Sequence, residues 1–205
     1  EKKCSHPYEE AKEGKPFFNH IMSVSNHRPF TYPDGKIDIP SNQKSRIGGV
    51  KYTDYALKQF FEMAKKQPWY SNTVFVIVAD HCASSSGKTE LPLDKYRIPG
   101  IIFSPDFIKP KEFNKLMSQV DVMPTLFGLL KMNYSSKFYG QNVFDVNYKP
   151  RAFIATYQDL GLIKDNVLTI ISPVKKVKQY NLKLKPDNGI KYNFQIKYDE
   201  VLMRS

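Results

Sequence analysis

The longest run of consecutive hydrophobic positions covers residues 73–79, where Val, Phe and Ile follow one another without a charged interruption. A strand with no hydrophobic alternation is typical of a position buried on both faces, as in the middle of a parallel sheet. Residues 100–104 form a second short apolar run that ends at Pro105. Residues 17–25 form a third, which we interpret as another buried strand. These runs predict the strands of a central sheet.

Two further segments place their apolar residues at helical spacing. The first covers residues 46–66, and the second covers residues 121–130 with Asp121 as the expected N-cap. Strands and helices therefore alternate along most of the chain. This order predicts an α/β fold with a mostly parallel central sheet flanked by helices.

The hydrophobic pattern changes after Pro150. Residues 152–157, 167–172 and 177–184 read as short strands, and residues 164–166 read as a turn between two of them. We expect a small antiparallel appendage packed on the α/β core. The predicted domains are residues 1–150 and residues 151–205.

Composition and charge narrow the function classes only slightly. The chain has 205 residues and a formal net charge of +11, which favours polyanionic partners such as lipid headgroups, phosphorylated substrates or nucleic acid. Its two cysteines, Cys4 and Cys82, cannot form a disulfide framework or a thiolate metal cage. Residues 174–198 are the segment that a nucleic-acid-binding module would use, but their alternating apolar residues suit a half-buried strand better. We therefore expect no nucleic acid partner.

Asp80 and His81 follow directly after the most hydrophobic run. Sites in open α/β sheets form beyond the carboxyl ends of strands. A carboxylate oxygen and an imidazole nitrogen at such a point suit a divalent cation. The alternative is structural: Asp80 caps a loop and His81 is an ordinary polar residue. Two ligands alone cannot hold a catalytic metal, so further ligands are expected elsewhere.

His27 and Arg28 occupy a polar loop at the end of the run 17–25. An imidazole and a guanidinium on one loop can bind an oxyanion through charge-assisted hydrogen bonds, although a lone loop histidine is often structural. His20 lies within the predicted strand and is expected in the core or an interface, and His6 lies in a polar segment.

Residues 82–89 end in Gly-Lys-Thr, as a nucleotide-binding P-loop does. Cys82 stands where that loop needs its first glycine, and Pro92 follows too soon for the helix that should come next. A serine- and glycine-rich loop beside a metal site is the better interpretation. Lys88 in this loop is a candidate contact for a substrate anion.

Four motifs in sequence order resemble the sulfatase-like branch of the alkaline phosphatase superfamily, closest to the lipoteichoic acid synthase and phosphoglycerol transferase group. Residues 25–30 resemble its His-x-Pro-Phe loop, and residues 76–81 its strand ending in an Asp-His metal pair. Residues 96–102 resemble its Arg-Ile-Pro entry to a strand, and residues 119–126 its Val-Asp-x-x-Pro-Thr helix start. The last two motifs are mainly structural in the family.

The resemblance implies a metal-dependent transferase or hydrolase of phosphate or sulfate esters. It is most like a phosphoglycerol or phosphoethanolamine transferase acting on membrane or envelope glycolipids, and a sulfatase is the alternative. Asp80 and His81 would bind Mn, Mg, Zn or Ca, and His27, Arg28 and Lys88 would contact the ester. The family's nucleophile is expected upstream of Glu1, so this chain alone is expected to be inactive and to need the preceding part of its domain. The family also implies a periplasmic or extracellular location with upstream membrane-spanning helices.

Overall fold

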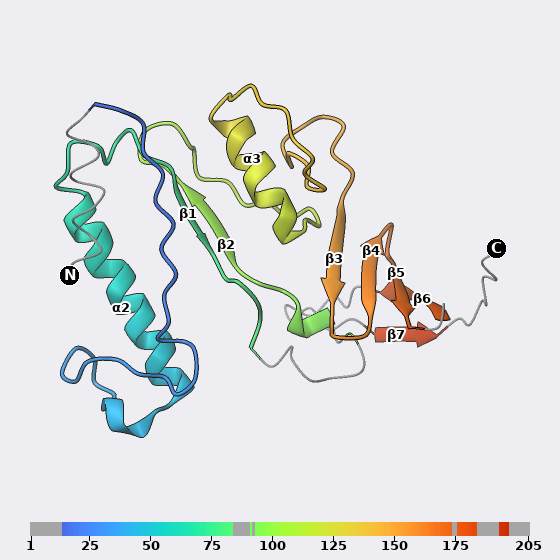
Figure 1. Ribbon diagram of the computed structural model, residues 1–205, viewed down its shortest axis with the longest axis horizontal. Helices are drawn as coiled ribbons and strands as arrows, with labels where there is room; N and C mark the ends of the chain where they lie inside the picture. Colours follow the sequence, from blue (N-terminus) through green and yellow to red (C-terminus); the bar gives the residue numbers. More distant parts are fainter. Residues whose placement is uncertain (1–13, 84–90, 92, 174–175, 184–192, 197–205) are drawn as a thin grey trace. The chain divides into compact units, whose positions relative to one another are not determined.

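The computed structural model describes residues 14–83, 91, 93–173, 176–183 and 193–196 (Figure 1). The chain forms two compact units, one of residues 1–76 and 102–109 and the other of residues 77–101 and 110–205. The helices and strands, in order, are η2 Ser41–Gln43, α2 Arg46–Ala64, β1 Phe75–Val78, η3 Leu93–Lys95, β2 Gly100–Phe103, η4 Gln119–Asp121, α3 Val122–Leu129, β3 Arg151–Ala155, β4 Leu160–Lys164, β5 Val167–Ser172, β6 Lys176–Lys183 and β7 Asn193–Ile196.

Helix α2 begins where the sequence predicts. Ser45 has extended backbone angles, and its side-chain oxygen accepts a hydrogen bond from the amide of Gly48. This bond satisfies one of the unpaired amides of the first turn. The last residue of α2, Ala64, is buried. The predicted helix over residues 46–66 is confirmed, two residues shorter at its end.

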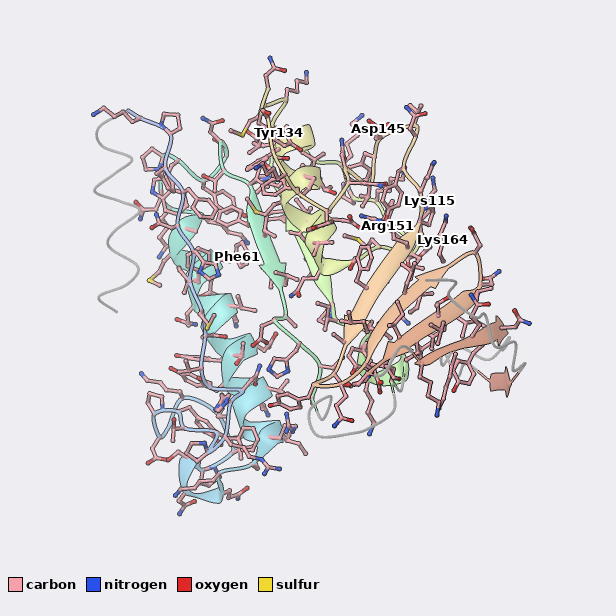
Figure 2. The ribbon with its side chains drawn as sticks, turned by 45° about the vertical axis from the view of Figure 1, so that its right-hand side comes forward. Phe61, Lys115, Tyr134, Asp145, Arg151 and Lys164 are labelled. Carbon is pink, nitrogen blue, oxygen red and sulfur yellow. The ribbon has the colours of Figure 1, made fainter. Side chains whose placement is uncertain are left out.

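Aromatic side chains form the core of the first unit around Phe75 of β1. The ring of Phe75 lies 5.1 Å from that of Phe61 on α2 and 5.9 Å from that of Phe103 on β2, measured between centroids. Figure 2 shows Phe61 on the helix. Trp69 and Tyr70 approach the same ring from the segment after α2. Edge-to-face, tilted and stacked aromatic pairs of this kind stabilise the core beyond the apolar area that each ring buries.

The prediction of a mostly parallel central sheet is not confirmed, because the described sheets are antiparallel. β1 pairs with β2 in a two-stranded sheet (Figure 1). The amide of Ala79, just after β1, donates to the carbonyl of Pro99, just before β2, so the end of one strand meets the start of the other. An unbroken apolar run reports burial, and burial does not fix the direction of the neighbouring strand.

The predicted buried strand over residues 17–25 is wrong for this structure. Residues 16–24 have no regular secondary structure, and the side chains of Phe18, Met22 and Val24 are 72%, 65% and 68% exposed. His20, expected in the core, is also exposed. A strand needs a neighbour to accept its backbone hydrogen bonds, and no described strand pairs with this segment.

A five-stranded antiparallel sheet in the order β3-β4-β5-β6-β7 occupies residues 151–196 of the second unit (Figure 1). The predicted strand over residues 167–172 is β5, and the predicted turn carries left-handed angles at Asp165 and Asn166, as a tight hairpin requires. In strand β6, the side chains of residues 177–180 are half-buried. The core of this unit contains the buried residues Leu91, Leu93, Ile154, Leu168 and Ile170.

Strand β4 has no counterpart among the predicted strands. It is only five residues long and contains Gly161, which is a weak strand former. A Cβ atom at Gly161 would lie 2.7 Å from Cγ1 of Ile154, so the close packing of β4 on β3 requires glycine here. The division into domains 1–150 and 151–205 stays a prediction.

Asp121 does not cap α3 in the way the sequence suggests. The helix is preceded by η4, and the cap of this combined segment is Ser118, whose backbone amide donates to Oδ2 of Asp121 at 2.9 Å. Ser118 and Asp121 form a reciprocal capping box. Asp121 is therefore the third residue of the turn, and its carboxylate is turned inward.

Candidate metal and anion site

Asp80 and His81 follow the end of strand β1, and their exposed side chains lie next to each other. Oδ2 of Asp80 lies 3.4 Å from Nε2 of His81, and the two side chains are 72% and 67% exposed. The backbone amide of His81 donates to Oδ1 of Asp80 at 2.9 Å, which orients the carboxylate toward the imidazole. The role of these two side chains as metal ligands stays a prediction.

The hydrogen bond at the other ring nitrogen assigns the tautomer of His81. Nδ1 lies 2.8 Å from the carbonyl oxygen of Cys82. A carbonyl only accepts, so Nδ1 carries the hydrogen and the Nε2 of a neutral ring carries a lone pair. A histidine that binds a metal through one nitrogen commonly donates its other N–H to a backbone carbonyl in this way.

This donor set fits a divalent cation. Two ligand atoms about 2.1 Å from one ion at a tetrahedral angle are about 3.3–3.5 Å apart, which matches the separation of Oδ2 and Nε2. With no cation or proton between them, two acceptors face each other. The described residues contain no group of three or more His, Cys, Asp or Glu placed to hold an ion.

Three of the four sequence motifs meet at this strand end. Nε2 of Gln119 donates to the carbonyls of Ala79 and Asp80 at 2.9 and 3.0 Å, and Sγ of Cys82 donates to the carbonyl of Arg97 at 2.7 Å. Gln119 and Arg97 belong to the motifs of residues 119–126 and 96–102, for which the sequence analysis expects a mainly structural role. Their proximity to Asp80 could not be found from local spacing, because Gln119 is 39 residues away along the chain.

The loop with His27 and Arg28 belongs to the first unit. His27 Nδ1 donates to the carbonyl of Arg28 at 2.7 Å, so its Nε2 is also left as a lone pair in the neutral ring. The loop is held at Phe30, which is buried, has a left-handed φ of 60° and lies under the guanidinium of Arg46 at 5.0 Å. Both His27 and Arg28 are exposed. Their expected role beside the Asp80–His81 pair stays a prediction.

A family model described as Sulfatase matches residues 5–132, more than half of the chain. The chain belongs to the sulfatase family. The predicted resemblance to the sulfatase-like branch of the alkaline phosphatase superfamily is thereby confirmed.

The sulfatase-family chain has curated relatives and solved neighbours of the same kind. It is 30% identical over 146 residues to the lipoteichoic acid synthase of Staphylococcus saprophyticus, covering 58% of this chain and 21% of the relative. It is 31% identical over 138 residues to the lipoteichoic acid synthase-like YvgJ of Bacillus subtilis, covering 57% and 22%. The chain thus spans about a fifth of the length of these relatives.

Among solved structures, a protein of the alkaline phosphatase superfamily from Vibrio parahaemolyticus matches with a TM-score of 0.83 and 28% identity, covering 97% of this sulfatase-family chain and 48% of that chain. The structure of Ps i-CgsB matches with a TM-score of 0.66 and 19% identity, covering 88% and 47%. The second likeness supports the fold alone.

A buried ion pair supports the turn that carries Gln119 in this sulfatase-family chain. Arg151, at the start of β3 (Figure 2), donates from Nη1 and Nη2 to the two oxygens of Asp121, each at 2.8 Å. Asp121 has no exposed surface and also accepts from the amide of Gln141 and the hydroxyl of Tyr148. All these bonds hold the ionised carboxylate in place.

The environment of Asp121 changes two pKa values. Burial alone would raise the pKa of the Asp121 carboxyl, but the hydrogen bonds from Arg151, Ser118 and Gln141 outweigh it and hold the pKa below 3.8. Burial, together with the negative charge of Asp121, raises the pKa of Tyr148 to about 12. Tyr148 therefore stays a neutral donor throughout the physiological range.

The lowered pKa of Asp121 predicts a pH-dependent contribution to stability. A carboxyl whose pKa is lower when folded stabilises the protein above its unfolded pKa, and this contribution is lost as the pH falls through the folded pKa. We expect Asp121→Asn to lower the free energy of unfolding most at pH 5 to 7 and progressively less below pH 3.8. Urea unfolding at several pH values measures this, with the exposed Asp106→Asn as the control. An equal loss at every pH would contradict the prediction.

The other sequence-predicted residues stand as follows. Lys88, Cys4 and His6 lie outside the described residues, so the anion contact proposed for Lys88 stays a prediction. In the part of the chain that the structure describes, no helix is both long and apolar enough to cross a bilayer.

Proposed function

We propose that this sulfatase-family chain forms part of a metal-dependent enzyme that cleaves phosphate esters and transfers the phosphoryl-bearing group to an alcohol. The proposed activity is most like that of a phosphoglycerol transferase acting on membrane or envelope glycolipids. The observation that carries the proposal is the Asp80–His81 pair, with Oδ2 and Nε2 3.4 Å apart and Nδ1 of His81 2.8 Å from the carbonyl oxygen of Cys82. Relatives named lipoteichoic acid synthases support the choice of a glycolipid substrate.

The proposed cofactor is one divalent cation, with Mn, Mg, Zn and Ca as candidates. Asp80 would hold it through Oδ2 and His81 through Nε2. When bound, the cation would polarise the ester oxygens as a Lewis acid. Because a catalytic ion needs more than two protein ligands, we propose that the other ligands and the nucleophile come from the part of the family fold that this chain does not span. The solved relative is about twice as long as the region matched here.

We propose that His27 and Arg28 bind the non-bridging oxygens of the ester. The guanidinium of Arg28 is always charged, and its N–H groups match the geometry of a phosphate. His27 donates Nδ1–H to the carbonyl of Arg28, so it contacts an anion through Nε2 only when that nitrogen also carries a proton. Hydrogen-bond donors in these positions would stabilise the negative charge that develops on the ester oxygens during the displacement.

The location that we propose is the outer face of a membrane. The net charge of +11 would hold the chain near anionic headgroups, where each lysine or arginine close to the surface contributes about 1 kcal/mol. A lipid-linked phosphoglycerol ester would then meet the site at the bilayer surface.

Calorimetric titration with MnCl2 tests the metal assignment. We expect the wild-type chain to bind one ion weakly, and Asp80→Ala and His81→Ala each to weaken this binding at least tenfold further, because each removes one of two ligands. Asp54→Ala, which removes an exposed carboxylate on α2, is the matched control and is expected to bind as the wild type does. Equal affinity in all four proteins would remove the metal role from this pair.

A second experiment separates the two ester classes. The whole enzyme is incubated with a lipid that carries a labelled phosphoglycerol headgroup, and with an aryl sulfate in parallel. Transfer of label to an added glycolipid alcohol is the expected result. Turnover of the sulfate alone would favour the sulfatase alternative.

A further inference from the structure

The side-chain amide of Gln119 is hydrogen-bonded to the backbone that carries the Asp80–His81 pair. Its nitrogen lies 2.9 Å from the carbonyl of Ala79 and 3.0 Å from the carbonyl of Asp80. Both carbonyls only accept, so the group that faces them is the NH2 and each bond uses one of its two hydrogens. The amide therefore joins two successive peptide units at the end of β1.

Buried groups hold the turn that presents Gln119. Gln119 is the first residue of η4, between Ser118 and the buried Asp121 of the capping box. Arg151 holds Asp121 with two hydrogen bonds of 2.8 Å. The side chain of Gln119 is exposed, but its backbone is anchored on both sides by buried groups.

Other hydrogen bonds also lie at the end of β1. The amide of Ala79 bonds to the carbonyl of Pro99 at 3.4 Å, which is a long hydrogen bond, and Cys82 bonds to the carbonyl of Arg97 at 2.7 Å. Neither contact touches the carbonyl of Asp80. Gln119 binds this carbonyl, and it therefore holds the peptide unit between Asp80 and His81.

We infer that Gln119 is a positioning residue for the Asp80–His81 pair. The amide of His81 belongs to the peptide unit whose carbonyl Gln119 binds, and this amide in turn donates to Oδ1 of Asp80 at 2.9 Å. Rotation of this peptide unit would move both the carboxylate and the imidazole. Gln119 therefore sets the 3.4 Å separation between Oδ2 and Nε2, together with the Nδ1–H bond to Cys82. The bound cation is part of the function proposed above. This inference rests on that proposal for the reason why the pair is positioned, but the geometry that it describes does not.

Nitrogen-detected NMR of the metal-free chain tests the geometry directly. We expect His81 of the wild type to show the Nδ1–H tautomer. In Gln119→Ala and Gln119→Glu the signal is expected to shift toward the Nε2–H tautomer that solvated imidazoles prefer, because neither side chain can donate to the two carbonyls at neutral pH. Gln158→Ala, at another exposed glutamine of the same unit, is the control. An unchanged His81 signal in both Gln119 variants would overturn the inference.

Titration with MnCl2 gives the second measurement. Loss of a residue that orients metal ligands typically weakens metal binding about 10- to 100-fold, and we expect Gln119→Ala to fall in this range while its thermal midpoint stays close to that of the wild type. If Asp80→Ala weakens manganese binding, a shifted tautomer in Gln119→Ala together with wild-type affinity would overturn the positioning role. If the tautomer shifts but Asp80→Ala binds manganese as well as the wild type does, the proposed metal function fails and the geometric role of Gln119 stands.

Discussion

Arg151→Met is expected to lower the free energy of unfolding by about 3–5 kcal/mol, since removal of one partner leaves the other charge buried and unpaired. Asp121 has no exposed surface, and Arg151 is only 6% exposed. The guanidinium supplies two of the hydrogen bonds to the carboxylate and a third to the carbonyl of Tyr139 at 3.0 Å. It also lies over the rings of Tyr148 and Phe153. Methionine keeps part of this packing and loses every donor.

Urea unfolding followed by circular dichroism measures the loss. Arg97→Met, at an exposed arginine of the same unit, is the control and is expected within about 0.5 kcal/mol of the wild type. The double variant Asp121→Asn/Arg151→Met is expected to be more stable than the sum of the two single losses predicts, because the buried charge is absent. A loss below 1 kcal/mol in Arg151→Met would show that the pair does not support the fold.

Gly140→Ala is expected to cost about 3 kcal/mol, which is at the high end for a single substitution. A Cβ atom at this position would lie 1.8 Å from the carbonyl oxygen of Val120 and 2.6 Å from its carbon. Both are backbone atoms of η4, so no side-chain rotation relieves the clash. The segment has to move, and this motion pulls the amide of Gln141 away from Oδ1 of Asp121, to which it donates at 2.8 Å.

Thermal and urea unfolding of the Gly140 variant are compared with those of Gly100→Ala. A Cβ atom at Gly100 meets no heavy atom within 4 Å, so that variant is expected to unfold as the wild type does or slightly later. Similar stabilities for the two variants would contradict the close approach of Gly140 to η4.

The elements with strong local signals could be predicted from the sequence. Helix α2 has both helical spacing and the capping residue Ser45, and β5 has a clear apolar run. The direction of strand pairing could not be predicted, because it depends on which partner each strand finds. The segment 17–25 shows the same limit: its apolar residues predict burial, but no described strand pairs with it.

The candidate site was predictable where its residues are neighbours in sequence. Asp80 and His81 follow a hydrophobic run, and that placement alone indicates a site at a strand end. Gln119 contacts Asp80 from 39 residues away in the sequence, and Arg151 contacts Asp121 from 30 residues away. No periodicity or spacing in the sequence links these residues to their partners. The sequence predicts Asp121 as a helix cap, because an Asp before a helix usually has that role. In the structure Ser118 is the N-cap residue, and the carboxylate of Asp121 binds Arg151.

The ion pair between Arg151 and Asp121 has a practical consequence for dividing this chain. A fragment that stopped short of β3 would retain all four sequence motifs, including Asp80, His81 and Gln119, yet it would leave Asp121 without its guanidinium. The turn that presents Gln119 would then lose its main anchor. A fragment meant to keep the arrangement at Asp80 and His81 must therefore extend past Arg151, even though the match to the family model ends well before it.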